Sequence, residues 1–261
     1  MARLASSRWA RHWIQHFGKM LFPFDCSLCG LACERDRPLC DDCEASLKPN
    51  AFPCASCGLP LIQTDASVSP TDCGRCLSNP TPFDAVVAPW LYDLQMAHLI
   101  GQWKYHGNHW LTPLLADLWL EQQQLSVDCH GDNFSVDVIV PVPLTPLRLL
   151  HRGFNQSRLL STEIHRRLPT NHKPSLDYTL LSRTRQNGTQ ASLGAQARRA
   201  NIDHVFTVHR PCDNLRIAVV DDVVTTTATA SEIAKQLKRY GAARVEIWCI
   251  ARTPLPEYSY K

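Results

Sequence analysis

Twelve cysteines occur in the 261-residue sequence, and nine of them fall between residues 26 and 76. Eight of the nine form four pairs with Cys-x-x-Cys spacing, which sets two thiolates on one tight turn facing a single ion. Disulfide scaffolds usually join cysteines that lie far apart in the sequence, so this spacing favours metal binding. The eight residues are Cys26, Cys29, Cys40, Cys43, Cys54, Cys57, Cys73 and Cys76.

The four pairs form a repeat, because Cys-Ser-Leu-Cys-Gly-Leu at residue 26 and Cys-Ala-Ser-Cys-Gly-Leu at residue 54 are each followed by a second pair. Gly30 and Gly58 occupy the position of a knuckle turn that needs a positive φ. We therefore expect two structural zinc ions, one bound by the first four cysteines and one by the last four, with no open position for catalysis. Cross-braced pairing, iron–sulfur ligation and redox dithiols are the alternatives.

A second set of chemically suggestive residues forms the sequence Ile-Ala-Val-Val-Asp-Asp-Val-Val-Thr-Thr-Thr-Ala-Thr, from residue 217 to residue 229. Small and hydroxylated residues at the start of a helix let backbone N–H groups approach a phosphate, and the helix dipole adds to the attraction. Asp221 and Asp222 would accept hydrogen bonds from paired sugar hydroxyls or bind Mg²⁺. The pattern predicts a site for a ribose 5-phosphate; an ordinary strand–turn–helix with Asp and Thr caps is the alternative.

The elements that would position this turn alternate between strands and helices from Phe83 onward. Such alternation is typical of the α/β class, in which helices cover both faces of a parallel sheet and ligands bind beyond the carboxyl ends of the strands. The expected strands are Ala85–Trp90, Asp137–Val140, Leu215–Val220 and Arg244–Ile250, and the expected helices are Leu94–Lys104, Leu111–Gln124, Asn155–Leu168 and Thr229–Tyr240.

The composition, 44% hydrophobic and 20% charged, excludes a disordered or fibrous chain. We expect three parts: an amphipathic helix at residues 1–24, a double zinc ribbon at residues 25–80 and an α/β domain at residues 81–261. Charges interrupt the apolar positions of the first part, so we expect a helix docked on the protein rather than a signal peptide; membrane contact and a transit peptide are the alternatives. We expect no transmembrane segment and a cytoplasmic location, where thiols stay reduced.

The turn from residue 219 to residue 229 resembles the phosphoribosyl pyrophosphate (PRPP) signature of type I phosphoribosyltransferases. Further motifs narrow the resemblance to the ComF/GntX family, the competence protein F and DNA-utilisation group. These motifs are Val140-Pro-Val-Pro-Leu144, Arg148, Arg152-Gly-Phe-Asn-Gln156, Gln190 and Arg198-Arg-Ala-Asn201. The cysteine repeat is similar to that family's double zinc ribbon. The resemblance runs from residue 24 to about residue 252 and implies a parallel-sheet, type I phosphoribosyltransferase-like domain preceded by a small double zinc ribbon.

The resemblance implies that Asp221 and Asp222 hold the 2- and 3-hydroxyls of the ribose. The loop that would wrap the 5-phosphate consists of Thr225, Thr226, Thr227, Ala228 and Thr229. Where the family signature normally has glycine, this chain has Thr227, and a β-branched residue forced to a positive φ is strained by roughly 1–3 kcal/mol. We expect weakened or altered phosphate binding; a different loop path, with the threonine hydroxyl as an extra donor, is the alternative.

The resemblance also implies that the loop after the first core strand, around Arg148, Arg152 and Gln156, faces the pyrophosphate and its Mg²⁺. Residues 183–201 would form a mobile hood over it. The charge pattern agrees, because residues 144–200 contain ten basic and two acidic side chains in a chain whose net charge is only +3. A concentration of guanidinium groups suits a pyrophosphate, whose oxygens they contact in a bidentate manner.

Three functions follow from these patterns. The first is a magnesium-dependent phosphoribosyltransferase that displaces pyrophosphate with a nitrogen nucleophile, although no general base or acceptor is identified. The second is a non-catalytic module that senses its ligand or handles single-stranded DNA during uptake and use of external DNA, a process with which the family is associated. The aromatic and basic segment at residues 102–110 would stack bases in that case, or else it is a helix end packed on the core. The third is a zinc-ribbon scaffold for partner proteins.

Overall fold

The computed structural model describes residues 24–33, 35–62, 71–105, 107–130 (124–130 by backbone alone), 136–168, 173–183 and 205–255. The N-terminal helix expected at residues 1–24 and most of the expected hood at residues 183–201 lie outside the described residues. The chain divides into two compact units between Leu47 and Lys48, and each is described by itself. This division falls between the two cysteine ribbons, so the domain boundaries 25–80 and 81–261 remain a prediction.

The smaller unit contains little regular structure. A bridge joins Asp25 to Ala32, and the helix α2 spans Asp41–Ala45. Arg37 donates a hydrogen bond of 2.5 Å to Glu44 across this unit. Its buried side chains are few, which is the situation in which a bound metal is usually needed to complete a fold.

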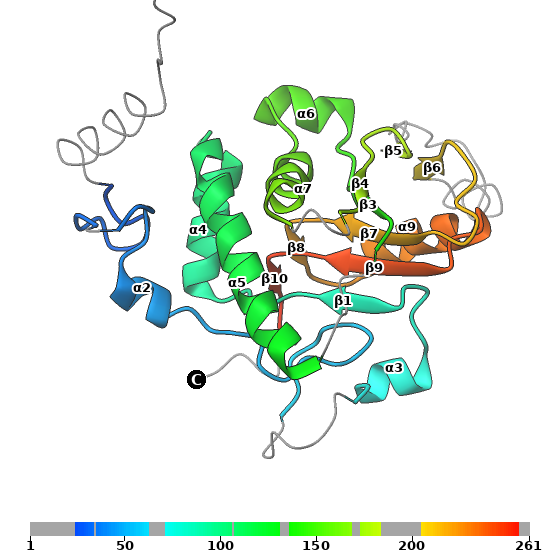
Figure 1. Cartoon of the computed structure of the whole chain (residues 1–261), viewed down its shortest axis with the longest axis horizontal. Helices are drawn as coiled ribbons and strands as arrows, with labels where there is room; N and C mark the ends of the chain where they lie inside the picture. Colours follow the sequence, from blue (N-terminus) through cyan, green and yellow to red (C-terminus); the bar gives the residue numbers. More distant parts are fainter. Residues whose placement is uncertain are drawn as a thin grey trace, which may run out of the picture. The chain divides into compact units, whose positions relative to one another are not determined.

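Five strands form the central sheet of the larger unit, in the order β1, β9, β7, β3, β4 (Figure 1). Every neighbouring pair is parallel, and Val219 of β7 lies opposite Ile247 of β9 and Val140 of β3. The predicted α/β class with a parallel sheet is therefore confirmed. The strands are β1 (Ala85–Val87), β9 (Arg244–Trp248), β7 (Arg216–Val220), β3 (Val138–Pro141) and β4 (Ser175–Leu176).

The four helices expected in the larger unit lie close to their expected positions, and two others, α3 (Gly74–Ser78) and α6 (Pro146–Arg152), were not expected. The expected four are α4 (Leu94–Tyr105), α5 (Thr112–His130), α7 (Gln156–Arg167) and α9 (Ala228–Arg239), with a single 3₁₀ turn, η1, at His109–Leu111. Within the described part of the chain, none of these helices combines the length and the hydropathy that crossing a bilayer requires.

Two additional small sheets were not expected from the sequence. One joins β2 (Trp90–Leu91), β10 (Ala251–Arg252) and β8 (Val223–Val224) in parallel, and the other is the antiparallel pair β5 (Leu181–Arg183) and β6 (Phe206–Val208). The strands expected at Ala85–Trp90 and Arg244–Ile250 are each interrupted, because their last residues turn out of the central sheet and lead into the first of these small sheets.

Helix α6 replaces the loop that was expected after the first core strand. The Thr145 side chain accepts a hydrogen bond from the backbone N–H of Arg148, and Pro146 occupies the first helical turn. The helix ends at Gly153, which adopts a φ of +76°. These are ordinary start and stop signals, so the sequence did contain the information that predicts this helix.

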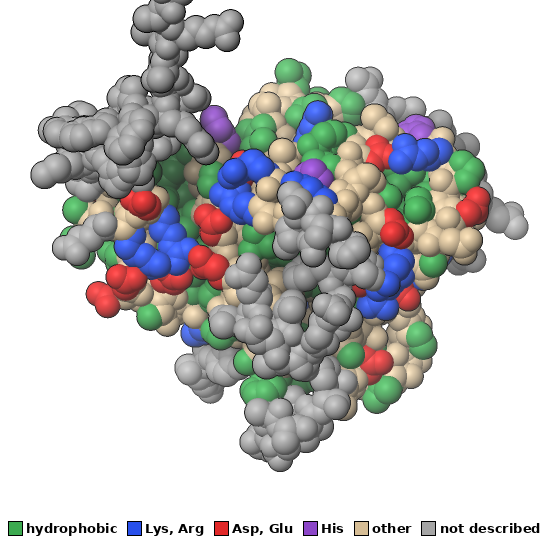
Figure 2. Space-filling model, in the orientation of Figure 1, with side chains coloured by type: hydrophobic (Ala, Val, Ile, Leu, Met, Phe, Trp, Pro, Cys, Tyr) green, Lys and Arg blue, Asp and Glu red, His purple; other side chains and the backbone are tan. Residues whose placement is uncertain are grey.

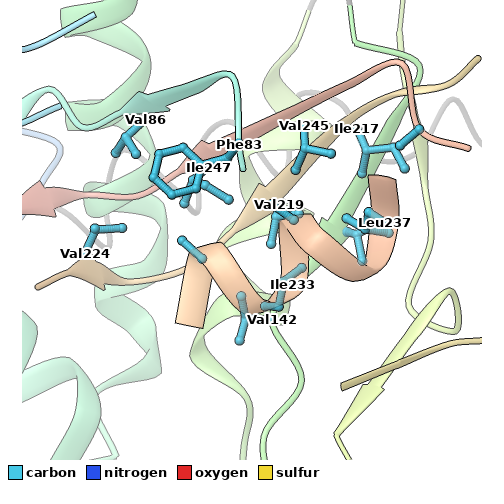
Figure 3. Packing of buried hydrophobic residues seen from close by; sticks show 14 of the residues in the cluster. Phe83, Val86, Val142, Ile217, Val219, Val224, Ile233, Leu237, Val245 and Ile247 are labelled. Atoms are coloured by element: carbon cyan, nitrogen blue, oxygen red, sulfur yellow. The ribbon is translucent and has the colours of Figure 1, made fainter. Parts of the chain in front are cut away.

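Side chains of the central strands alternate between two buried faces. Val219 of β7 and Ile247 of β9 belong to one hydrophobic cluster, which in Figure 3 packs against Ile233 of α9. On the opposite face, the ring of Trp248 packs against Trp119 of α5 with centroids 5.1 Å apart. Helices thus cover both faces, which is why the strands are apolar at nearly every position.

The chain leaves β3 and β7 in opposite directions. From β3 it runs through α7 to β4 at one edge of the sheet, whereas from β7 it runs through α9 to β9 on the other side. In open α/β sheets, ligands bind in the crevice where two such connections diverge beyond the carboxyl ends of the strands. In this protein that place is next to Val142, after β3, and Asp221, after β7.

Candidate functional site

Asp221 is the first residue after β7, and its carboxylate is held by the protein. One oxygen, Oδ1, accepts hydrogen bonds from the Ser157 hydroxyl at 3.1 Å and from the backbone N–H of Asp222 at 2.9 Å. Burial, together with the negative charge of Asp222, raises the pKa of Asp221 to about 7. The carboxyl group therefore changes its charge near neutral pH.

Asp222 is neutralised by Lys104, whose Nζ lies 2.8 Å from Oδ2. The other oxygen of Asp222 accepts a hydrogen bond of 2.7 Å from the backbone N–H of Val223. Lys104 is at the end of α4 and was not among the predicted site residues, although it belongs to the aromatic and basic segment at residues 102–110. The sequence offered no signal that this lysine would face the carboxylate pair.

The remainder of that segment is divided between core and surface. Trp103 is fully buried, and its indole N–H donates a hydrogen bond of 3.0 Å to Thr112. Tyr105 and Trp110 are exposed, and the guanidinium of Arg152 lies 5.3 Å from the centre of the Tyr105 ring. The core-packing interpretation therefore describes Trp103, whereas the exposed Tyr105 ring lies beside Arg152, a predicted pyrophosphate residue.

The threonine loop, defined as residues 225–229, joins β8 to α9. Thr225, Thr226, Ala228 and Thr229 are exposed, and together with Asp221 they line a small cavity of about 50 Å³. Thr227 is the N-cap of α9, but no side chain caps the helix, because its own hydroxyl donates to the Thr226 carbonyl at 2.6 Å instead. The first N–H groups of α9 are thus not capped by a side chain, which suits an anion.

Thr227 adopts the left-handed conformation, with φ +62° and ψ 0°. The loop therefore keeps the backbone conformation that glycine would adopt without strain, rather than a path that avoids it. The structure therefore does not show the alternative, a different loop path. Holding the β-branched Thr227 at this positive φ costs roughly 1–3 kcal/mol of backbone strain.

The basic residues predicted to face a pyrophosphate occupy different environments. Arg148 of α6 is exposed, and Arg152 is half-buried against Tyr105. Burial, and next the positive charge of Arg148, lower the pKa of Arg183, whereas the charge of Asp221 opposes that shift. Arg183 therefore lies within electrostatic reach of both groups. Gln156 is only 1% exposed at the start of α7, so its side chain is part of the interior rather than of an open surface.

Arg252 of β10 connects the second cysteine ribbon to the threonine loop. The side chain is 2% exposed, and its Nε donates a hydrogen bond of 2.9 Å to the carbonyl of Cys57. Its Nη1 donates to the carbonyls of Val224 at 3.0 Å and Thr225 at 2.6 Å. One guanidinium thus fixes the start of the threonine loop against the ribbon, and no sequence motif pointed to it.

The eight cysteines of the repeat come together in two groups of four. The sulfur atoms of Cys26, Cys29, Cys40 and Cys43 all lie within 4.8 Å of one another, as do those of Cys54, Cys57, Cys73 and Cys76. This is the sequential grouping rather than the cross-braced one. The distances Cys29–Cys40 and Cys57–Cys73 are 3.8 and 3.7 Å, close to the edge of about 3.8 Å of a tetrahedron with Zn–S bonds near 2.3 Å. Both groups could hold zinc.

The two groups are built on the same knuckle turn. Gly30 and Gly58 have φ values of +72° and +65°, which confirms the positive φ predicted for both. Their backbone N–H groups donate to the carbonyls of Cys26 and Cys54 at 2.8 and 2.9 Å. The repeat in the sequence is therefore a repeat in backbone geometry.

The groups differ in their surroundings. Cys54, Cys57 and Cys76 belong to the hydrophobic core of the larger unit, whereas Cys29 of the first group is exposed. Burial raises the pKa of both Cys43 and Cys76, and the neighbouring thiols add to it. Four such sulfurs cannot all carry charge side by side without a cation, which is consistent with metal binding.

Comparison with known proteins identifies relatives over most of the chain. The DNA utilization protein YhgH of Salmonella typhimurium is 34% identical over 215 residues, which cover 82% of this chain and 90% of the relative. Competence protein F of Haemophilus influenzae is 31% identical over 218 residues, with the same shares covered. No protein-family model matches the chain.

Two solved structures are distantly similar to this chain. The allosteric regulatory enzyme of purine biosynthesis is 18% identical, with a TM-score of 0.34 over 53% of this chain and 24% of that chain. A hypoxanthine phosphoribosyltransferase from Staphylococcus aureus is 13% identical, with a TM-score of 0.29 over 53% of this chain and 61% of the other. Scores of this size do not by themselves establish a common fold; the α/β class of this chain is shown by its own sheet.

Replacing one cysteine in each group should have unequal effects on stability. Cys26→Ser and Cys54→Ser should each remove one metal ion per chain, because serine is a poor zinc ligand. Cys54→Ser should lower the Tm more, since Cys54 is 1% exposed in the core of the larger unit. Metal analysis and thermal unfolding measure both effects. An unchanged metal content in either variant would contradict the grouping.

Replacing Thr227 with glycine should increase the free energy of unfolding by about 1 kcal/mol, because glycine adopts a positive φ without steric strain. The matched control is Thr226→Gly, a neighbouring residue that is not at positive φ, and it should lower the free energy of unfolding by roughly 0.5–1 kcal/mol. Urea unfolding measures both values. Equal effects of the two substitutions would show that Thr227 is not strained.

Proposed function

Because the chain belongs to the ComF/GntX family of competence and DNA-utilization proteins, we propose that it binds PRPP, or a related ribose 5-phosphate, and acts in the uptake or use of external DNA. The observation that carries the proposal is the joint position of Asp221, Asp222 and the threonine loop. Paired carboxylates and an uncapped helix N-terminus follow the same strand, where the connections from β3 and β7 diverge.

Each part of the ligand has a matching group in this proposal. The two carboxylates accept hydrogen bonds from the 2- and 3-hydroxyls of the ribose, and the N–H groups at the start of α9 bind the 5-phosphate. In the structure, the Lys104 ammonium group forms an ion pair with Asp222. A ribose hydroxyl that bonds to Asp222 would either share the carboxylate with this ammonium group or displace it. Ligand binding therefore competes with an internal ion pair, so Lys104 lowers the affinity for ribose.

The pyrophosphate is assigned to Arg148, Arg152 and Arg183, the last of which lies within electrostatic reach of Asp221. Magnesium would arrive with the pyrophosphate oxygens. Among the described residues, Asp221 and Asp222 form no group of three or more side chains able to ligate a metal, and their oxygens already accept hydrogen bonds from the protein. When bound, the ion would neutralise the leaving group.

Two functions remain for this site, transfer and sensing. In transfer, a nitrogen nucleophile displaces pyrophosphate from C1 of the ribose, and the protein contributes position and positive charge. A second candidate, a module that binds the same ligand without turning it over, is favoured by the Lys104–Asp222 ion pair and by the strained Thr227. Release of pyrophosphate from PRPP in the presence of candidate bases distinguishes the two.

Direct handling of single-stranded DNA is less well supported. On the described part of the face shown in Figure 2, Lys and Arg side chains form several separate groups rather than a continuous basic stripe. Proteins that follow a nucleic-acid backbone usually present a continuous groove of positive charge with stacking aromatic residues. We therefore propose that the link to DNA utilization comes from the ribose phosphate that the site binds, and not from direct contact with DNA. The proposed zinc ions would be structural, and the proposed location stays cytoplasmic.

The double substitution Asp221→Asn with Asp222→Asn should weaken the binding of ribose 5-phosphate at least about tenfold, because two charge-assisted hydrogen bonds become neutral ones. Isothermal titration calorimetry measures the affinity. The control is Asp213→Asn, an exposed aspartate in the turn before β7, which should bind like the unchanged chain. Equal affinities for all three proteins would refute the assignment of the carboxylates.

The affinity for ribose 5-phosphate should rise about tenfold between pH 6 and pH 8. The pKa of Asp221 is raised to about 7, so the fraction in the hydrogen-bond-accepting, ionised form increases across this range. The single variant Asp221→Asn should lose this part of the pH dependence and keep the part that comes from ionisation of the phosphate itself. Identical pH profiles for the two proteins would contradict the assignment.

A further inference from the structure

A larger cavity lies on the other side of the threonine loop, between that loop and the second cysteine ribbon. Its volume is about 560 Å³, and we call it the ribbon cavity. The ribbon side contributes α3 and residues 78–82, and the other side contributes residues 225–227 together with α9. Asp221 and Asp222 are not part of its lining, so it is separate from the small cavity that faces the carboxylates.

Three basic side chains line the ribbon cavity, beside Cys57 and Cys76 of the second cysteine group. They are Arg75 of α3, Lys235 of α9 and Arg252 of β10, and no aspartate or glutamate is among the described lining residues of the cavity. Arg75 and Lys235 are exposed, and neither forms an ion pair with a described carboxylate. Three cations around one cavity attract an anion.

Arg252 provides the strongest argument for an anion in the ribbon cavity. Its guanidinium is 2% exposed and donates only to carbonyl oxygens, those of Cys57, Val224, Thr225 and Thr253. No described carboxylate pairs with it. A buried positive charge is stabilised by nearby negative charge, and an anion in the ribbon cavity would add to what the thiolates of the second cysteine group supply.

We propose that the ribbon cavity binds the phosphate group of a small phosphorylated ligand of about nucleotide size. A volume of 560 Å³ falls in the range usual for small-molecule sites. Hydroxyl and amide groups of Ser78, Asn79, Thr81 and Ser231 also line the cavity and can orient the rest of the ligand. A cavity of this volume has room for one mononucleotide, so we choose a mononucleotide rather than nucleic acid as the ligand.

The proposal goes beyond the proposed function, because it concerns a different cavity with its own basic residues. The two sites share residues 225–227, which line both cavities, and Arg252 hydrogen-bonds to the loop from the ribbon side. A ligand in the ribbon cavity would therefore act on the loop that is proposed to bind the 5-phosphate. The second ribbon would in this way be part of a ligand site as well as a structural element.

The test uses 5′-AMP and the full chain that carries Asp221→Asn and Asp222→Asn, so that ribose recognition at the end of β7 is removed. Calorimetry should still detect one binding site. Adding Arg75→Ala with Lys235→Ala should weaken that binding at least about tenfold, because two charge-assisted contacts are lost. The matched control is Arg239→Ala, an exposed residue one turn beyond Lys235 on α9 that does not line the cavity, and it should change nothing.

Each outcome decides the proposal. Loss of AMP binding with Arg75→Ala and Lys235→Ala, but not with Arg239→Ala, supports it. Absence of AMP binding in the Asp221→Asn and Asp222→Asn chain overturns it and leaves the proposed function standing. AMP binding that is equal with and without the cavity substitutions also overturns it. The same holds if single-stranded oligonucleotide binds in place of AMP and depends on the cavity cations.

Discussion

Two carboxylates at the end of the buried strand β7 share one site, and the electrostatic repulsion between them organises the residues around it. Asp221 is held by Ser157, and burial together with Asp222 raises its pKa to about 7. Asp222 remains in place because Lys104 reaches it from the end of α4. Asp222 is therefore paired within the protein, so that the proposed sugar would have to compete with this ion pair.

The position of the threonine loop depends on a second constraint, a set of hydrogen bonds from Arg252. Arg252 donates hydrogen bonds to the carbonyls of Val224 and Thr225 and to that of Cys57. Because this guanidinium is buried, it positions the loop firmly even though Thr227 has an unfavourable φ. The second cysteine group thus supports the loop as well as the ribbon, and its cysteines pack in the same hydrophobic core as β7 and α9.

Much of the fold follows from local patterns in the sequence. The knuckle turns at Gly30 and Gly58 and the strand, turn and helix around Asp221 lie where the residue types place them. Helix α6 was not predicted, although Thr145, Pro146 and Gly153 mark its ends. The resemblance implied a pyrophosphate loop in this segment, whereas the local capping residues start and end a helix there.

The sequence by itself determined which cysteines form the two knuckle turns, where a strand ends in two carboxylates, and that a threonine loop follows them. These features depend on neighbours a few residues apart, whose geometry the backbone dictates. Only the tertiary structure decided that Lys104 pairs with Asp222 and that Arg252 reaches Cys57, 195 residues away in the chain. The reason is that such pairs depend on which strands are neighbours in the sheet. Parallel strands are joined by long crossovers, so local sequence does not specify these neighbours.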